Sequence, residues 1–241
     1  MNELDRIARE YHLTPQNDMF IENICQEYEI EWVKQRIASN SSVLELGFGD
    51  GVTFRSLANH CQLSVVDGSQ LIVDEAQRVR GEIGADAMVY KSYFEEFEPD
   101  TSFDYVFASH VLEHVANPDL IVEKFDHWLK PTGQVIIVVP NSQSIHRRLA
   151  TIMGLQPRLD SLSARDLLVG HLRVYDLSEM ESLLRTKGWE IVERRGFFLK
   201  PLSNSQMINF DSNLIRAMCE ISDSVPPDLC ANIALVVSRK N

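Results

Sequence analysis

Three glycines at alternate positions follow a short apolar run near the start of the chain, in Val43-Leu44-Glu45-Leu46-Gly47-Phe48-Gly49-Asp50-Gly51. The run predicts a buried strand that ends in a tight turn, because glycine reaches positive φ without strain. Glycines also let a ligand approach main-chain N–H groups. Residues 52–60, which follow, have a helical pattern. This order places a nucleotide-like ligand at the carboxyl end of the first strand of an open α/β sheet.

Strand-like and helix-like stretches alternate along the rest of the chain. Helices between strands predict right-handed crossovers and therefore a largely parallel sheet. The run Lys130-Pro131-Thr132-Gly133 contains residues that stop helices and predicts a turn before the strongest strand. The predicted strands cover 42–46, 63–66, 88–90, 103–108, 134–139, 190–194 and 231–238, and the predicted helices cover 52–60, 70–83, 111–114, 118–129 and 177–187.

Two long stretches do not fit a minimal alternation of this kind. They cover 141–175 and 197–230, and each follows a predicted strand. Long insertions after strands commonly carry binding surfaces. The first 35 residues have a helical pattern and precede the sheet. We therefore expect a single domain over 1–241, with 1–35 as a helical cap and both insertions on the side where a substrate binds.

The charge balance and the cysteines exclude several classes of protein. The chain has 23 Lys and Arg against 35 Asp and Glu, a net charge of −12, which disfavours a nucleic-acid groove. None of the four cysteines belongs to a C-x-x-C pair, so a zinc knuckle is not expected. The sequence contains no leader-like segment and no apolar run of the ~18 residues that cross a membrane. We expect a cytoplasmic protein with free thiols.

An acidic residue lies at the end of the second predicted strand, 20 residues after Gly47. Asp67 can accept hydrogen bonds from both hydroxyls of a ribose, and Gly68 and Ser69 follow it. The alternative role for Asp67 is to cap the helix that starts near residue 70. A dinucleotide fingerprint would carry its third glycine where this chain has Val52, which disfavours a nicotinamide oxidoreductase.

Further motifs follow the glycine turn and Asp67 in a recognisable order. They are Phe103-Asp104-Tyr105-Val106, Leu112-Glu113-His114-Val115 and Leu129-Lys130-Pro131-Thr132-Gly133-Gln134. In order and spacing the set resembles the class I S-adenosylmethionine-dependent methyltransferases, over about residues 40–140 and more loosely through 170–175 and 188–189. Within that superfamily it looks most like the small-molecule branch that includes the ubiquinone-biosynthesis O-methyltransferases.

The resemblance implies a fold, a cofactor and a set of cofactor-binding positions. The fold is a Rossmann-like α/β domain with a seven-stranded, doubly wound, mostly parallel sheet whose last strand is antiparallel. The cofactor is S-adenosyl-L-methionine. The matching positions are Glu45, Gly47, Phe48, Gly49, Asp67, Gly68, Ser69, Ser92, Tyr93, Phe94, Ser109 and His110. The acid that the family usually carries after the third strand is missing from its usual place in the run Lys91-Ser92-Tyr93-Phe94-Glu95-Glu96, so no partner for the adenine amino group is assigned.

The implied activity is methyl transfer to a small molecule, at a hydroxyl or carboxyl oxygen. A neutral imidazole suits the proton transfer that a hydroxyl acceptor requires, and the candidates are His110, His114 and His171. His114 has a packed, structural role as its alternative. The predicted substrate-binding residues are His146, Arg147, Arg173 and Tyr175, of which the first two could hold an anionic acceptor.

Other interpretations remain open at this stage. The acceptor atom could be a nitrogen of a small molecule or protein, or the chain could be a non-catalytic, cofactor-binding partner subunit. His110-Val111-Leu112-Glu113-His114 matches the H-x-x-E-H zinc pattern, but Pro118 closes the segment too early for the helix that zinc binding needs, so no metal is expected. The sequence also allows a homodimer.

Overall fold

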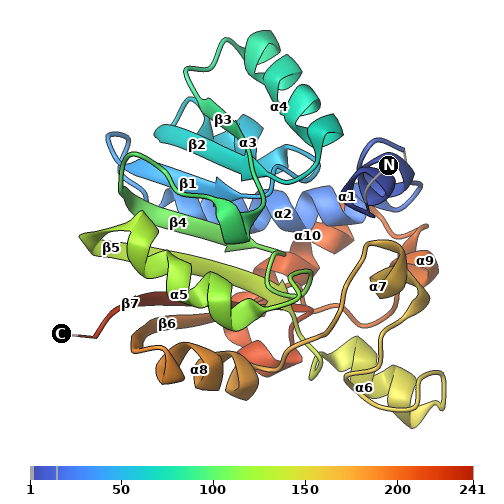
Figure 1. Ribbon diagram of the computed structural model, residues 1–241. Helices are drawn as coiled ribbons and strands as arrows, with labels where there is room; N and C mark the ends of the chain where they lie inside the picture. The colour runs from blue at the N-terminus through green and yellow to red at the C-terminus, as the bar shows by residue number, and fades with distance from the viewer. Residues whose placement is uncertain (1–2, 15, 241) are drawn as a thin grey trace.

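A computed structural model describes residues 3–14 and 16–240 of the chain. Seven strands form one sheet in the order β3-β2-β1-β4-β5-β7-β6 (Figure 1). The strands are β1 (Ser42–Leu46), β2 (Gln62–Asp67), β3 (Met88–Lys91), β4 (Phe103–Ser109), β5 (Leu129–Pro140), β6 (Trp189–Phe197) and β7 (Asn232–Arg239). Strands β1 to β5 pair in parallel, and β7 runs antiparallel to both β5 and β6. The predicted fold, with its antiparallel last strand, is confirmed.

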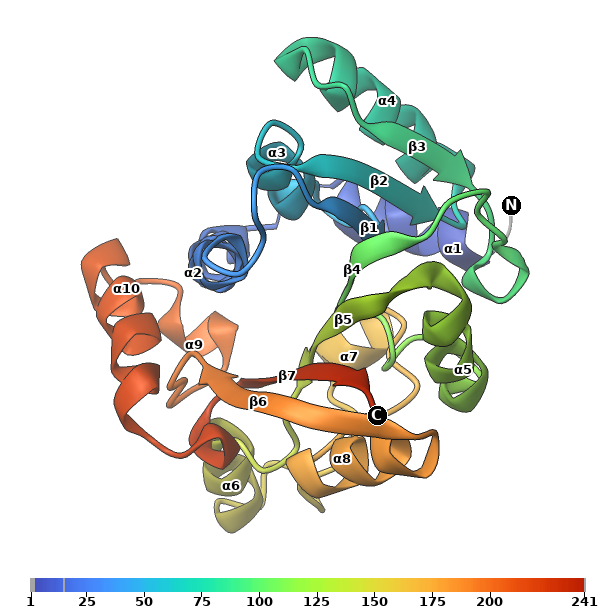
Figure 2. The same ribbon diagram turned by 90° about the vertical axis from the view of Figure 1, so that its left-hand side faces the viewer.

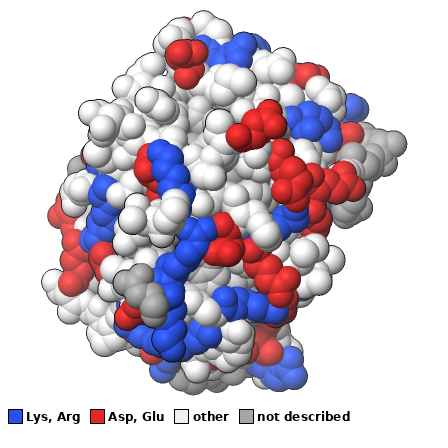
Figure 3. Space-filling view, turned by 60° about the vertical axis from the view of Figure 1, so that its left-hand side comes forward, with Lys and Arg blue, Asp and Glu red and all other residues white. Residues whose placement is uncertain are grey.

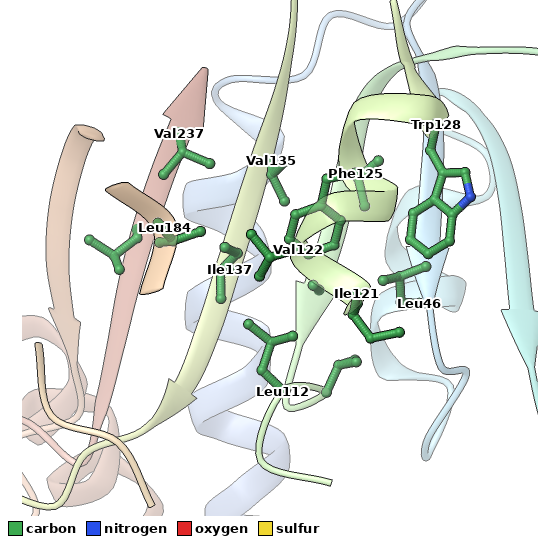
Figure 4. Close-up of a cluster of buried hydrophobic side chains, with 14 of the residues drawn as sticks. Leu46, Leu112, Ile121, Val122, Phe125, Trp128, Val135, Ile137, Leu184 and Val237 are labelled. Atoms are coloured by element: carbon green, nitrogen blue, oxygen red, sulfur yellow. The ribbon is translucent and has the colours of Figure 1, made fainter. Parts of the chain in front are cut away.

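Helices cover both faces of the sheet because side chains alternate along its central strands. Ile136 and Val138 of β5 belong to a buried cluster with α2 (Met19–Lys34), α3 (Val52–Leu57) and α4 (Gln70–Ile83). Val135 and Ile137 belong to the opposite cluster, with α5 (Pro118–Trp128) and α8 (Leu177–Thr186). Figure 2 shows the helices on either side of the twisted sheet, and Figure 4 shows part of the second cluster.

The start of the cap, the first insertion and the beginning of the second insertion lie on the right of Figure 1, whereas α2 packs on one face of the sheet. The N-terminal segment forms α1 (Glu3–Ile7), the π-helical turn η1 (Ala8–His12) and α2. The first insertion forms α6 (Ile145–Ile152) and α7 (Ala164–Leu168). The second forms α9 (Asn204–Met207), α10 (Ser212–Glu220), η3 (Ile221–Ser224) and η4 (Pro227–Leu229). Buried side chains of α10 pack on α2, which attaches this insertion to the cap.

The predicted helix over 111–114 is wrong, because the structure has only a turn there. Strand β4 ends at Ser109, and Asn117 already caps α5. The guanidinium of Arg173 donates to the main-chain carbonyls of Leu112, Val115 and Ala116. These carbonyls are therefore satisfied by a side chain instead of by a helix.

The sequence predicts a turn over 130–133 before β5. This prediction is wrong, because the run lies within that strand. Phe103 of β4 pairs with Leu129, whereas Tyr105 pairs with Gln134. The four intervening residues therefore form an irregularity in the pairing. Lys130 on this segment donates to Asp104, which also accepts from Ser42, so the motif acid Asp104 is structural.

No helix in the described part of the chain is long and apolar enough to cross a bilayer. On the face shown in Figure 3, acidic side chains interrupt the basic ones. An example on the surface is Arg78, which pairs with both Glu75 and Glu82.

Candidate active site

A cavity of about 520 Å³ opens where the cap and the two insertions meet the carboxyl ends of the central strands. Its size is typical of small-molecule sites, which span roughly 300–1,000 Å³. Residues of α1, η1 and α2 form one wall, and the glycine turn after β1 forms another. The segments after β2, β3, β4, β5 and β6, with the start of β7, complete it. The cavity thus lies at the position that the glycine turn predicts.

The glycine turn presents its main chain to the cavity. Gly47, Gly49 and Gly51 have φ of 77°, 53° and 74°, a region that other residues rarely adopt. A Cβ at Gly51 would lie 2.5 Å from the Phe48 ring, so this position needs glycine to close the turn. A Cβ at Gly49 would meet no described atom within 4 Å, so this stretch of main chain is open to a ligand.

Asp67 joins the glycine turn to the end of β2. Its Oδ2 accepts from the Phe48 N–H at 3.1 Å, and its Oδ1 accepts from the Ser69 N–H at 2.8 Å. Burial raises the pKa of Asp67, against the effect of these two donors. Ser69 caps α4 by accepting from the Ile72 N–H, so the alternative role of Asp67 as the helix cap is wrong.

The segment after β3 covers the side of the cavity next to Asp67. Tyr93 and Phe94 line it, as the sequence predicts. Ser92 is outside the cavity lining, and its hydroxyl donates to the Tyr93 carbonyl. Glu95, the residue after Phe94, also lines the cavity and brings a carboxylate to this segment.

Glu45 is buried at the end of β1 and forms part of the cavity wall. Its Oε2 has no hydrogen-bond partner among the described residues. Burial, followed by the charge of Asp67, raises the pKa of Glu45 well above its usual value. A ligand that donates a hydrogen bond at the glycine turn would satisfy this oxygen.

The N-terminal cap is fastened to the cofactor end of the cavity by two polar contacts. His12 Nδ1 lies 2.6 Å from the Asp50 carboxylate in the glycine turn. The Ser69 hydroxyl donates to the Asp5 carboxylate at 2.7 Å. These contacts hold η1 and α1 over the strand ends, as the predicted role of 1–35 requires.

His110 stands at the end of β4 with Glu113 behind it. The His110 backbone has a φ of 54°, and its N–H donates to the Val138 carbonyl of the neighbouring strand. Its Nδ1 lies 3.2 Å from Oε1 of the fully buried Glu113. Burial alone would lower the pKa of His110, but the hydrogen bond and charge of Glu113, with Glu29 and Glu22, raise it to about 9. Ser109 and His110 both line the cavity, as predicted.

The other two predicted catalytic histidines pack edge-on, with ring centroids 4.7 Å apart. His114 Nδ1 lies 3.3 Å from the Gly170 carbonyl, and burial lowers the pKa of His114 to about 4. His171 Nδ1 lies 3.0 Å from Asp166, and its Nε2 lies 3.9 Å from Glu113 Oε1. Both rings line the cavity, but each is already held by an oxygen of the protein.

His114, His171 and Glu113 bring three atoms of the types that bind metals within 4.8 Å of one another. The H-x-x-E-H pattern would instead pair His114 with His110 on one helix, and that helix is absent from this described segment. Hydrogen bonds to Gly170, Asp166 and His110 hold the three side chains. We therefore treat them as a hydrogen-bonded cluster and assign them no metal.

The acceptor end of the cavity is more polar than the sequence suggests. Tyr11 and Arg165 both contact Glu22, at 2.5 and 2.6 Å. Glu29 accepts from the Asn232 amide at 2.8 Å. Sequence analysis missed these residues, because the cap and the regions around α7 and β7 give no local signal that they meet. Both insertions contribute residues to the cavity lining.

Two of the four predicted substrate residues line the cavity and two do not. His146 and Arg147 of α6 line it, although Arg147 is buried in an ion pair with Asp166 at 2.7 Å. Arg173 and Tyr175 lie outside the lining. Arg173 donates to the carbonyls of the turn after β4, and the Tyr175 hydroxyl donates to the Leu112 carbonyl. The structure thus gives both residues the role of supporting the segment that carries His110.

Known proteins resemble this chain in sequence and in fold. A family model described as a methyltransferase domain matches residues 19–194. A ubiquinone biosynthesis O-methyltransferase of Xylella fastidiosa is 24% identical over 204 residues, covering 82% of this chain and 80% of that protein.

Two solved structures show the same fold at low sequence identity. A methyltransferase from Thermotoga maritima, described as a possible histamine N-methyltransferase, has a TM-score of 0.64 at 16% identity, covering 99% of this chain and 100% of its own. A methyltransferase from Aquifex aeolicus has a TM-score of 0.61 at 13% identity, covering 96% and 97%. Because the family model spans more than half of the sequence and agrees with the motifs and the fold, the chain belongs to the methyltransferase-domain family.

Proposed function

We propose that this protein transfers a methyl group from S-adenosylmethionine to an oxygen of a small-molecule acceptor, a hydroxyl or a carboxyl group. The observation that carries the proposal is one cavity shared by the glycine turn with Asp67 and by the His110–Glu113 pair. The similarity to ubiquinone biosynthesis O-methyltransferases supports oxygen as the acceptor atom.

The residues at the cofactor end fit this cofactor. Asp67 would accept from the ribose hydroxyls, and the open main chain at Gly49 would lie along the methionine part. The unpartnered Oε2 of Glu45 would accept from a donor there, such as the ammonium of the amino acid part. Tyr93 and Phe94 would cover the adenine, with Glu95 as a candidate acceptor for its amino group. When bound, the cofactor supplies an electrophilic methyl carbon and a thioether leaving group.

His110 is the proposed general base for a hydroxyl acceptor. Glu113 engages Nδ1 and fixes the orientation of the ring, which leaves Nε2 for the acceptor. The buried carboxylate also stabilises the imidazolium that forms once the ring has taken the proton. The cap, fastened through His12 and Ser69, would exclude water from the site.

Calorimetry and a radiolabelled transfer assay test the proposal together. S-adenosylmethionine and S-adenosylhomocysteine should bind one site per chain, whereas NAD should not bind. Label should then pass from the methyl group to an acceptor in a panel of phenols, carboxylic acids and amines. Failure to bind either sulfur compound would refute the proposal, and labelling confined to amines would replace oxygen with nitrogen as the acceptor atom.

Replacing Asp67 should weaken cofactor binding more than it lowers the stability of the fold. Asp67→Ala is expected to raise the Kd of S-adenosylhomocysteine more than tenfold, because hydrogen bonds to a charged group are worth about 1.5–3 kcal/mol. Calorimetry measures the change, and Asp74→Ala on the exposed side of α4 is the control. An unchanged Kd for Asp67→Ala would show that Asp67 only organises the turn.

The pH dependence of kcat should follow the loss of a proton from His110, whose pKa depends on Glu113. Because a base must be unprotonated and the pKa of His110 is raised to about 9, kcat for a hydroxyl acceptor should rise as pH increases through that value. Glu113→Gln removes the group that raises this pKa, so the rise should move to lower pH. Glu123→Gln, on the surface of α5, should leave the profile unchanged. An unmoved profile in Glu113→Gln would show that another group titrates.

A further inference from the structure

The acceptor end of the cavity contains one ammonium group that has no protein partner. Lys200 follows β6 in the second insertion and lines the cavity. Its Nζ makes no hydrogen bond or ion pair with any residue in the described ranges 3–14 and 16–240. Burial lowers the pKa of Lys200, and the charge of Glu22 acts against this shift. Lys200 is only partly exposed, and a ligand that supplies a counter-ion would stabilise its charge in this site.

The two guanidinium groups in the same wall are already paired. Arg165 donates to Asp18 and to Glu22, each at 2.6 Å. Arg147 donates to Asp166 at 2.7 Å and to the Ser161 carbonyl at 2.8 Å. Protein carboxylates thus already compensate the charge of both guanidinium groups, which distinguishes them from Lys200.

The nearby carboxylates are also committed. Glu22 accepts from Tyr11, Arg165 and Asn204. Asp166 accepts from Arg147, His171 and both the N–H and the hydroxyl of Ser163. Lys200 would have to compete with these donors for either acid. Glu29, which also lines the cavity, is buried, and burial raises its pKa.

His146 adds a second unsatisfied group beside Lys200. Its Nδ1 is buried and has no hydrogen-bond partner among the described residues. Burial, followed by the charges of Lys200 and Arg147, lowers the pKa of His146 to about 2. The ring is therefore neutral and can donate one N–H to an anion without competing for protons. Two unsatisfied groups in one wall thus both favour negative charge.

We infer that the acceptor carries an oxyanion group, a carboxylate or a phosphate, held by Lys200 Nζ and the His146 ring while its nucleophilic oxygen reaches His110. All three side chains line the same cavity. The inference rests on the proposed function and specifies its substrate class. It also changes the predicted anion site, because His146 keeps the role that the sequence suggests, whereas Lys200 takes the place of Arg147.

Calorimetry on protein saturated with S-adenosylhomocysteine tests this subsite. The probes are 4-hydroxybenzoate, phenyl phosphate and the uncharged 4-hydroxybenzamide. Wild-type protein should bind at least one anionic probe more tightly than the amide, and the tighter of the two identifies the carboxylate or the phosphate. Lys200→Met should raise the Kd of that probe at least tenfold, equivalent to about 1.4 kcal/mol, with no change for the amide. Lys34→Met, on the surface of α2, is the matched control.

Three results would overturn the inference. They are equal binding of charged and neutral probes, no binding of either anion at millimolar concentration, and a loss of S-adenosylhomocysteine affinity in Lys200→Met that would assign the lysine to the cofactor. Lys200→Gln and His146→Phe provide second variants if Lys200→Met does not fold. Lys200-dependent anion binding without methyl transfer to any acceptor would refute the proposed function and leave the subsite standing.

Discussion

His110→Ala is expected to lower kcat by roughly 10²–10⁴-fold, the usual contribution of a positioned general base. The variant removes the imidazole that Glu113 orients at 3.2 Å. His171 is held in a similar way, with Nδ1 3.0 Å from Asp166, but its Nε2 lies 3.9 Å from Glu113. His114 has a pKa that burial lowers to about 4, which makes it a weaker base. Initial rates at saturating cofactor and acceptor measure the loss.

The same variant should bind the cofactor as tightly as the wild type does. Calorimetry with S-adenosylhomocysteine should give a Kd close to that of wild type, because Asp67 and the glycine turn are untouched. His127→Ala, on the exposed side of α5, is the control and should leave kcat unchanged. A wild-type kcat in His110→Ala would reject His110 as the base, and a large loss in His171→Ala instead would assign the role to His171.

Asp166→Ala is expected to lower the free energy of unfolding by about 3–5 kcal/mol, the cost of leaving a buried charge unpaired. The Arg147 and Asp166 side chains are only 7% and 10% exposed and lie 2.7 Å apart. Asp166 also accepts from His171 and Ser163, which ties α7 to the cluster of Glu113, His114 and His171. Urea unfolding followed by circular dichroism measures the change.

A surface pair in the same insertion provides the control. Arg158 and Asp160 lie 2.9 Å apart but are 75% and 53% exposed, so Asp160→Ala should cost no more than about 1 kcal/mol. The double variant Arg147→Met/Asp166→Ala should lose less stability than Asp166→Ala alone, because no buried charge is then left unpaired. If Asp160→Ala and Asp166→Ala lowered the free energy of unfolding equally, burial would not explain the stability that the Arg147–Asp166 pair contributes.

The buried pair should also depend on pH. Hydrogen bonds from His171 and Ser163 and the charge of Arg147 hold the pKa of Asp166 below its usual value, despite the opposing effect of burial. A lowered folded-state pKa stabilises the protein above the ordinary pKa of aspartate, ~3.9. That stability is lost as pH falls through the acid range, and it should be missing from Asp166→Ala at every pH.

The strands and the cofactor end were predictable because their signals are local. Apolar runs such as 134–139 mark buried strands, and Asp67 lies at a strand end in the register that the fold requires. Helix 111–114 was predicted wrongly, because Arg173, some 60 residues away, satisfies the carbonyls of that segment. Glu95 was missed because one loop position decides whether an acid meets the cavity.

The substrate residues were harder to predict because a side chain's role depends on its partners. Arg147 and Arg173 are both cations in an insertion, as Lys200 is. Asp166 neutralises Arg147, and Arg173 is used by main-chain carbonyls outside the cavity lining. Lys200 stays unpartnered within the described structure and lies in the cavity wall. No periodicity or motif separates these three residues, since the separation depends on contacts between distant segments.

The sequence by itself determined the α/β alternation, the glycine turn after the first strand and the place of Asp67, because backbone preferences and strand-end registers act over a few residues. Tertiary structure alone decided which polar groups face the acceptor. One cavity is lined by residues that lie between positions 4 and 232 of the sequence. They come from the cap, the region after β4, the two insertions and the start of β7. Burial there lowers the pKa of His146 to about 2, whereas the Glu113 carboxylate raises that of His110 to about 9 against the effect of burial. These pKa shifts arise only when folding brings distant charged groups together in a medium of low polarity.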